Sequence, residues 1–476
     1  MNQLTVRQRK ILYASVAVVL LIPIILLGAP ASSTSGGTRG FLAQSREKHD
    51  LGEASLGDVD PTSATMNLVL LGMRGVAASV LWSKADEYKD KKNFSQLEQT
   101  VESIILLQPH FKSVWRFQAW NLGYNVSAEC DAVADRYYWV KRGAKFMMRG
   151  VSRNRQVPEL YFDTGTFLGN KLGTADEKES YRKFFLTDPD EARWKGGPDE
   201  EINPKRQAHY LVAREWYQNA NDLLEQKGVE QHIMDLALFI AYPYRSLMAH
   251  AQEMQKEGVQ ADLDSMTPEQ VEAAYQEWSK QVRAAWDQAY SDWTNIYGRH
   301  KFLSAGFGVL VLENDEAGLK ELADIAKTED VTFEQKREWQ DRYRKLTSYP
   351  YWKLHCDIEK RESMTQARYH LAEGRRLYRE VQDFDAARAH LEQGIAQLAL
   401  VIREYQVNAT TNLVVADEEE IIEEALKAII IWRQVLEMLG QPIPEKYPLQ
   451  ELWEIPELQS QRDDLMLRFQ QWNGTL

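Results

Sequence analysis

Apolar residues recur every three to four positions along most of this chain, and strict alternation of apolar and polar residues is rare. The first spacing places apolar side chains on one face of an α-helix, whereas alternation is typical of a half-buried strand. Clusters of β-branched residues are also scarce. The pattern therefore predicts an all-α body.

The longest periodic stretch follows Thr267, where Thr267 and Gln270 form a predicted capping box that opens a helix. Its apolar face is aromatic, which allows two interpretations. The first, which the pattern favours, is a core helix packed on both neighbours; the second is a surface that stacks sugars or holds proline-rich peptides. The residues of this face are Tyr275, Trp278, Val282, Trp286, Tyr290, Trp293 and Tyr297.

One apolar run differs from all others because it carries no charge and no helical polar face. It spans residues 11–30 and follows three cations, so residues 11–28 are predicted to cross the bilayer, with the rest of the chain on the extracytoplasmic side. A secretory signal peptide with a cleavage site at Ala29-Pro30-Ala31 is the alternative. Residues 31–61 are polar and rich in Ser and Gly, which predicts a flexible linker.

A repeat becomes visible when the sequence is shifted by 34 residues. Leu81 then falls on Trp115, Ala85 on Ala119 and Tyr88 on Leu122. Between the two copies lies a second apolar series, Leu97, Val101 and Ile104, which Pro109 closes because proline cannot continue a helix. The spacing predicts paired helices that stack on their successors, with alanine where the backbones approach most closely.

A related pattern occurs late in the chain, within "LAEGRRLYREVQDFDAARAHLEQGIAQL". Glycines replace the small alanines, and Asp383-Phe384-Asp385 supplies the predicted turn. The residues expected to pack this second hairpin are Leu371, Gly374, Tyr378, Ala387, Leu391 and Gly394.

Both stretches resemble the tetratricopeptide (TPR) repeat, in which a large apolar residue is followed one turn later by a small one. The resemblance rests on "LWSKADEYKDKKNFSQLEQTVESIILLQP" and on the following "VWRFQAWNLGYN". With its N-terminal anchor, the chain also resembles a group of uncharacterised bacterial membrane-anchored TPR proteins, over residues 62–172 and, less specifically, 350–405. This resemblance implies a TPR-like helical-hairpin solenoid behind a transmembrane helix, and it implies no activity.

Changes in composition predict the following organisation. An acidic loop rich in Pro and Gly is expected to form a domain boundary or a mobile loop. The predicted segments are an anchor at 1–30, a linker at 31–61, TPR-like repeats at 62–187, the acidic loop at 188–203, a helical middle section at 204–347, C-terminal hairpins at 348–440 and a capping helix at 441–476.

Charge and residue usage exclude several classes of ligand. With 57 Lys and Arg against 70 Asp and Glu, the net charge of −13 repels polyanions, so no nucleic acid is expected. Two cysteines, Cys130 and Cys356, are too few for a disulfide framework, and either a single bridge or two free thiols fits the sequence. None of the nine histidines lies at metal-ligand spacing, and no catalytic or cofactor motif occurs, so no metal, no cofactor and no enzymatic activity are expected.

The prediction for function is a membrane-anchored scaffold that holds a protein or peptide partner in a groove. The groove side chains are expected to project from the first helices of the repeats, namely Lys84, Tyr88, Arg116, Gln118, Asn121 and Asn125. One alternative is an exported α/α-toroid carbohydrate-active enzyme, whose carboxylate pair would come from acids such as Asp135, Asp163 or Asp287. Another is a purely structural protein of the bacterial envelope. The sequence does not fix the oligomeric state.

Overall fold

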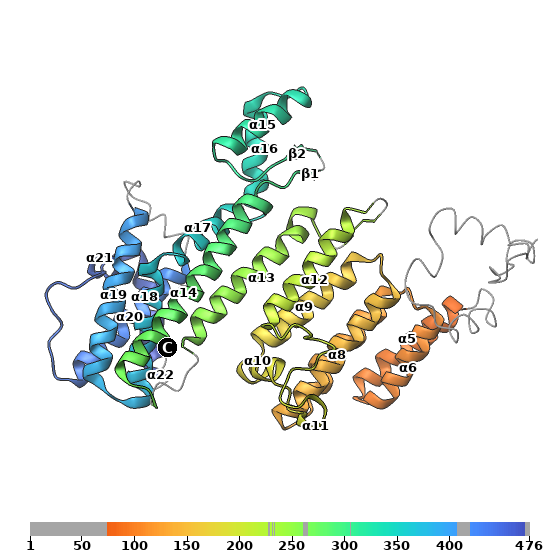
Figure 1. The fold of residues 1–476 in the computed structure, drawn as a ribbon, viewed down its shortest axis with the longest axis horizontal. Helices are drawn as coiled ribbons and strands as arrows, with labels where there is room; N and C mark the ends of the chain where they lie inside the picture. The colour runs from red at the N-terminus through yellow and green to blue at the C-terminus, as the bar shows by residue number, and fades with distance from the viewer. Residues whose placement is uncertain are drawn as a thin grey trace, which may run out of the picture. The chain divides into compact units, whose positions relative to one another are not determined.

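The computed structural model describes residues 74–226, 229–230, 232, 234–259, 265–304, 306–406 and 419–471. The chain is mostly helical, which confirms the all-α prediction (Figure 1). It divides into two compact units, Met1–Ile233 and Met234–Leu476, and each is described here by itself.

Unit 1 is built from successive helices that pack on their neighbours in sequence order. Its elements are α5 (Arg74–Asp90), α6 (Phe94–Leu107), α7 (Lys112–Trp120), the π-helix η1 (Asn121–Val126), α8 (Val133–Arg153), α9 (Pro158–Thr174), α10 (Lys178–Leu186), α11 (Glu191–Trp194) and α12 (His209–Leu224).

The first hairpin of unit 1, α5 and α6, has the turn and the end that its sequence predicts. Lys92 takes a left-handed conformation with φ of 53°, and Asn93 caps α6 by accepting a hydrogen bond from the Gln96 N–H at 3.3 Å. The helix α6 ends at Leu107, two residues before Pro109. Its apolar residues Leu97, Val101 and Ile104 are buried, as the repeat pattern requires.

The predicted contact residues of the repeat lie at close approaches between helices. Ala85 and Ala119 are buried, Trp115 is fully buried and Leu81 packs on the same core from its edge. A Cβ atom on Gly143 of α8 would lie 2.7 Å from the carbonyl oxygen of Ala119, so the close approach of α7 and α8 requires glycine at position 143.

The acidic segment 188–203 differs from its prediction as a boundary or mobile loop. Asp188, Asp199 and Asn203 are buried, and the segment is fixed to α8 by ion pairs from Lys141 to Asp188 at 2.6 Å and from Lys145 to Asp199 at 2.8 Å. The composition is polar because these carboxylates neutralise cations that α8 buries. The division between the two units comes later in the chain, after Ile233.

Unit 2 holds the longest helices and a short hairpin of strands. Its elements are α13 (Leu236–Glu257), α14 (Pro268–Asp292), the π-helix η3 (Trp293–Tyr297), β1 (Phe302–Ser304), β2 (Gly308–Leu310), α15 (Glu316–Thr328), α16 (Phe333–Leu346), α17 (Tyr349–Glu359), α18 (Glu362–Arg376), the π-helix η4 (Leu377–Val381), α19 (Phe384–Gln406), α20 (Glu419–Met438), α21 (Gln450–Trp453), the 3₁₀ turn η6 (Pro456–Leu458) and α22 (Gln459–Gln471).

The aromatic face of α14 is core, as its spacing favoured. The capping box of Thr267 and Gln270 is formed, and Trp286 and Trp293 are fully buried. The Trp293 indole N–H donates to the Tyr349 carbonyl at 3.2 Å, and the Tyr297 hydroxyl donates to the Ala237 carbonyl at 2.9 Å. Because α17 packs on both α14 and α18, the predicted division at 347/348 is not a boundary between compact units.

The late repeat forms a hairpin, α18 and α19, in which the two glycines lie at the contact. A Cβ atom on Gly374 would lie 2.7 Å from Cγ of Leu391, and one on Gly394 would lie 2.7 Å from Cδ2 of Leu371. Leu371 and Ala387 are buried, and Tyr378 is half-buried in η4. The glycines therefore set the separation of the two helices.

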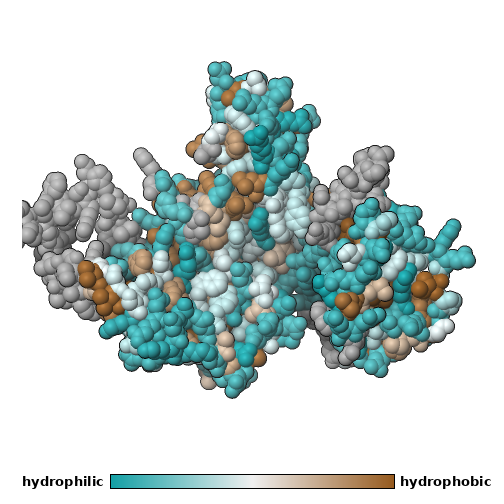
Figure 2. Space-filling view, turned by 180° about the vertical axis from the view of Figure 1, so that it is seen from behind, coloured by the Kyte–Doolittle hydropathy of each residue, from teal (hydrophilic) through white to brown (hydrophobic). Residues whose placement is uncertain are grey.

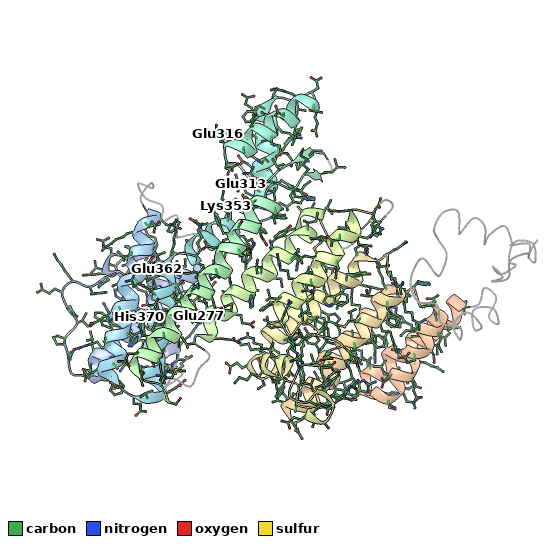
Figure 3. The ribbon with its side chains drawn as sticks, in the orientation of Figure 1. Glu277, Glu313, Glu316, Lys353, Glu362 and His370 are labelled. Carbon is green, nitrogen blue, oxygen red and sulfur yellow. The ribbon has the colours of Figure 1, made fainter. Side chains whose placement is uncertain are left out.

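A small module of β1, β2, α15 and α16 extends from one end of α14 and α17 in Figure 1. The strands pair antiparallel, with Phe302 opposite Leu310. Two charged residues labelled in Figure 3 tie the module to α17, since Lys353 Nζ lies 2.7 Å from Glu313 Oε1. Glu313 also accepts a hydrogen bond from the Tyr349 hydroxyl at 2.7 Å.

The C-terminal capping segment is broken where one helix was predicted. Leu449 takes a left-handed φ of 65°, and Pro456 separates the short helix α21 from α22. The break follows from the missing N–H of proline, which cannot join the helical hydrogen bonds that precede it. Leu452, Leu465 and Phe469 still cover the core of unit 2.

The membrane anchor predicted at residues 1–30 and the linker at 31–61 lie outside the described residues. Among the residues that are described, no helix combines the length and the apolar character that a bilayer crossing demands.

Candidate functional site

A hollow of about 550 Å³ lies between α5 and the helix formed by α7 and η1. Aromatic and polar side chains line it, and none of the lining residues carries a carboxylate. We call it the aromatic hollow. Its lining residues are Trp82, Lys89, Ser113, Arg116, Phe117, Trp120, Asn121, Tyr124 and Asn125.

The sequence of α7 explains why two faces of one helix differ so strongly. Ser113, Arg116, Phe117, Trp120 and Asn121 follow one another at helical spacing and face the aromatic hollow. The opposite face packs into the core of unit 1 and is buried. Its residues are Val114, Trp115, Gln118, Ala119 and Leu122.

The wall of the aromatic hollow includes a π-helical turn, η1. Such wide turns are rare and occur frequently at functional sites. This one displays Asn121, Tyr124 and Asn125 on the hollow. Gly123 in the same turn leaves room for the ring of Phe167, with which any Cβ atom at this position would clash.

The aromatic rings of the lining form two contacting pairs. Trp82 of α5 lies against Phe117 at a centroid distance of 5.0 Å. Trp120 and Tyr124 stack in parallel, with centroids 4.5 Å apart and an angle of 10° between the planes. Phe167 of α9 meets both of these rings edge-on at 6.1 Å and holds them in place.

A buried side-chain amide forms part of the lining. Asn121 is 3 % exposed, and its Oδ1 accepts a hydrogen bond from Asn125 Nδ2 at 2.9 Å. Its own Nδ2 is buried and has no hydrogen-bond partner among the described residues. An unpaired buried donor costs about 1–3 kcal/mol of folding stability, and an acceptor on a ligand would offset this cost. Oε1 of Gln118, one helical turn earlier, is likewise buried and unpaired among the described residues.

The charges around the hollow are mostly cationic. Arg116 is paired with Asp163 of α9 at 2.6 Å, whereas Lys89 has no carboxylate partner in the described part of the chain and lies 5.6 Å from the centroid of Phe117. The ammonium of Lys171 lies 4.5 Å from the centroid of Tyr124. The rim therefore offers positive charge and aromatic faces together.

Burial changes the pKa of several groups near the hollow. It raises the pKa of Asp163 to about 6, because the loss of hydration outweighs the opposing effect of Arg116. It also raises the pKa of the Tyr124 hydroxyl to about 12 and lowers that of Lys171. At neutral pH Tyr124 is thus a neutral donor and acceptor.

Three of the six predicted groove residues, Arg116, Asn121 and Asn125, line the aromatic hollow. Lys84 is exposed and Tyr88 is half-buried on α5, and neither is part of the lining. The prediction that Gln118 lines the groove is wrong. Gln118 is 1 % exposed and lies in the core, because it follows Val114 by one helical turn on the buried face.

The sequence reasoning missed the aromatic lining. Trp82, Phe117, Trp120 and Tyr124 are not among the predicted groove residues. The helical spacing from Ser113 to Tyr124 contained the signal, because it defines a second face opposite the apolar one.

The acids considered for catalysis do not form a pair in the aromatic hollow. Asp135 of α8 and Asp287 of α14 are exposed, and Asp163 is held by Arg116. Within the described residues no group of His, Cys, Asp and Glu has the arrangement of a metal site. Cys130 and Cys356 are free thiols.

A larger hollow of about 650 Å³ lies on unit 2, and Figure 2 shows apolar side chains at the end of the unit formed by α19 to α21. Met438 and Ile443 of its lining are 55 % and 46 % exposed. Its polar residues are half-buried or exposed, although Arg433 Nε is a buried donor without a hydrogen-bond partner among the described residues. Its lining residues are Tyr378, Ile430, Arg433, Gln434, Glu437, Met438, Gln441, Ile443, Trp453, Met466, Phe469 and Gln470.

A third hollow, of about 400 Å³, lies among charged residues of α13, α18 and α20. At its base Arg368 pairs with the buried Glu359 at 2.6 Å, and Gln255 donates to the same carboxylate at 2.9 Å. Arg375 pairs with Glu424. Burial alone would raise the pKa of Glu359, but Arg368 outweighs it and the pKa is lowered. His370, labelled nearby in Figure 3, lies 3.1 Å from His390, measured between the Nδ1 atoms.

The chain was also compared with protein-family models, with curated proteins and with solved structures, and none of the three comparisons gives a match. The aromatic hollow is therefore interpreted from its own geometry.

Proposed function

We propose that this chain is a binding scaffold, whose unit 1 holds an extended segment of a partner protein in the aromatic hollow. The observation that carries the proposal is the buried, unpaired Nδ2 of Asn121 in an aromatic lining. A peptide carbonyl would satisfy this donor, and aromatic rings supply contact area at a small cost in side-chain entropy.

The scaffold is proposed to be a TPR-like solenoid. Ion pairs support two layers of helices, because α7 pairs with α9 through Lys112 and Glu159 at 2.9 Å and through Arg116 and Asp163. Likewise α6 pairs with α8 through Arg149 and Glu102 at 2.5 Å. Stacked hairpins are expected to bring first helices against first helices and second helices against second helices, and these ion pairs support that arrangement.

The apolar run at 11–28 adds a location to this proposal. A transmembrane helix there, preceded by Arg7, Arg9 and Lys10, would keep the scaffold at the extracytoplasmic face of a membrane. Binding is favoured over glycoside hydrolysis because that reaction requires two carboxyl groups and the hollow is lined by none.

Site-specific cross-linking tests the proposal in cells. Photoreactive benzoylphenylalanine in place of Tyr124 lines the hollow, whereas the same group in place of Tyr138, 52 % exposed on α8, lies outside it. The expected result is a cross-link from position 124 to one defined segment of a partner, lost when Asn121→Leu is added. Equal cross-linking from both positions, or a position-124 product that survives Asn121→Leu, would exclude the hollow as the binding site.

A further inference from the structure

The chemistry of the aromatic hollow also selects among peptides. We propose, resting on the function proposed above, that the hollow takes a proline-rich segment in the polyproline II conformation. The inference depends on which hydrogen-bonding groups the lining offers and which it lacks.

The lining is rich in groups that only donate hydrogen bonds. The indole groups of Trp82 and Trp120, the ammonium of Lys89 and the guanidinium of Arg116 have donors and no acceptor. The unpaired Nδ2 of Asn121 adds a buried donor, while the Oδ1 of the same residue is already bonded to Asn125. The acceptors of the lining are fewer, namely the hydroxyl oxygens of Ser113 and Tyr124 and the Oδ1 of Asn125, and no carboxylate lines the hollow.

A donor-rich hollow discriminates between peptide backbones. An ordinary residue brings an N–H group into the hollow, and that donor needs an acceptor to avoid the cost of burial. Proline has no N–H, so a proline-rich segment brings carbonyl acceptors and few donors. In the polyproline II conformation these carbonyls make no internal hydrogen bonds and are free to accept from Asn121.

The aromatic groups fit the same ligand. Trp82 of α5 lies against Phe117 of α7, and Trp120 and Tyr124 form a stacked pair in the same lining. Flat apolar pyrrolidine rings pack on such faces, and the segment loses little entropy because its conformation exists before binding. Sugars also stack on aromatic rings, but their hydroxyl groups bring donors that the lining does not match with carboxylates.

A binding measurement on the full chain in detergent tests the inference. The probes are a fluorescent oligoproline and an oligo(Gly-Ser) of equal length, both acetylated and amidated so that neither has a charged end. Anisotropy titrations are expected to give at least about tenfold tighter binding of oligoproline. Trp120→Ala and Asn121→Leu should each weaken it by about tenfold, whereas Trp139→Ala, a half-buried tryptophan on α8 outside the lining, should not change it.

The remaining outcomes separate this inference from the proposed function. Equal binding of both peptides would overturn the preference for proline and leave peptide binding in place. Oligoproline binding that Trp120→Ala does not weaken would place the peptide elsewhere and overturn the inference. If neither peptide binds while position 124 still cross-links a partner, the preference for proline is wrong; if the cross-link is also lost, both proposals fail. Circular dichroism of each variant establishes that its helices are intact.

Discussion

Each unit of the molecule buries polar side chains inside helical packing, and the two clusters are completed differently. In unit 2, Glu359 receives hydrogen bonds from Arg368 and Gln255, so its charge is balanced within the fold. In unit 1, the amide of Asn121 has a buried donor that no described residue accepts. A buried carboxylate that is paired within the fold stabilises it, whereas a buried donor without an acceptor beside a hollow is a group that a ligand acceptor would satisfy. Stability and binding should therefore respond in opposite ways at the two places.

The largest loss of stability is expected at the buried carboxylate of Glu359. Arg368→Ala leaves the buried Glu359 carboxylate without its cation, which costs about 3–5 kcal/mol of unfolding free energy. Denaturant unfolding combined with hydrogen exchange of α17 to α19 measures this loss in unit 2. As a matched control, Arg342→Ala breaks an exposed pair with Glu338 and should cost less than about 1 kcal/mol. Similar losses for both arginines would contradict the structural role of the cluster.

Unit 1 is expected to respond to pH through Asp163. Its pKa of about 6 in the folded chain exceeds the ordinary value of 3.8, so the folded state holds the proton more tightly. This contribution to stability is complete below pH 4 and is lost as the pH rises to about 6, up to about 3 kcal/mol. Asp163→Asn removes the titration. The stability of this variant relative to the wild type should rise over that interval, and a constant difference from pH 4 to 7 would show that burial does not dominate at Asp163.

The close approach of α18 and α19 predicts an intermediate effect. Gly374→Ala places a methyl group 2.7 Å from Leu391, and the resulting overpacking should cost about 1–3 kcal/mol despite the better helix propensity of alanine. Gly75→Ala is the control, because its nearest neighbour would be 3.9 Å away. Thermal melting of both variants compares them; an unchanged melting temperature for Gly374→Ala would mean that the helices separate freely.

Unit 2 is expected to respond to pH in the opposite direction, through His370. Burial, assisted by His390, lowers the pKa of His370 to about 4. The folded state therefore binds this proton more weakly than the unfolded state, and stability is lost as the pH falls from about 6.5 towards 4. In His370→Gln this part of the acid sensitivity should disappear from unit 2, measured by hydrogen exchange of α18 and α19. A variant as acid-sensitive as the wild type would assign the effect to other groups.

Much of the fold was predictable because apolar spacing reports which helix face is buried. It identified the hairpin of α5 and α6, the buried face of α14 and the glycine contacts of α18 and α19. Features that depend on partners distant in sequence were not predictable. The acidic composition of segment 188–203 predicted a boundary or a mobile loop. Its carboxylates instead pair with lysines of α8, and nothing in the local sequence shows that pairing.

The candidate site was predictable only in part, for a related reason. Arg116, Asn121 and Asn125 were placed on the groove by helical spacing alone. Gln118 was misplaced because a glutamine is rarely as buried as it is here. The helical spacing from Ser113 to Tyr124 defines the face that carries the aromatic lining, but the sequence did not predict the π-helical turn η1.

The most direct test is the substitution Asn121→Leu, read for stability and for binding in the same preparation. Because leucine removes an unpaired donor and retains the volume, the melting temperature is expected to stay constant or rise, while cross-linking from position 124 to the partner segment falls by about tenfold or more. A fall in stability as large as that of Arg368→Ala, with cross-linking unchanged, would show that Asn121 serves the fold and that the aromatic hollow is not a binding site.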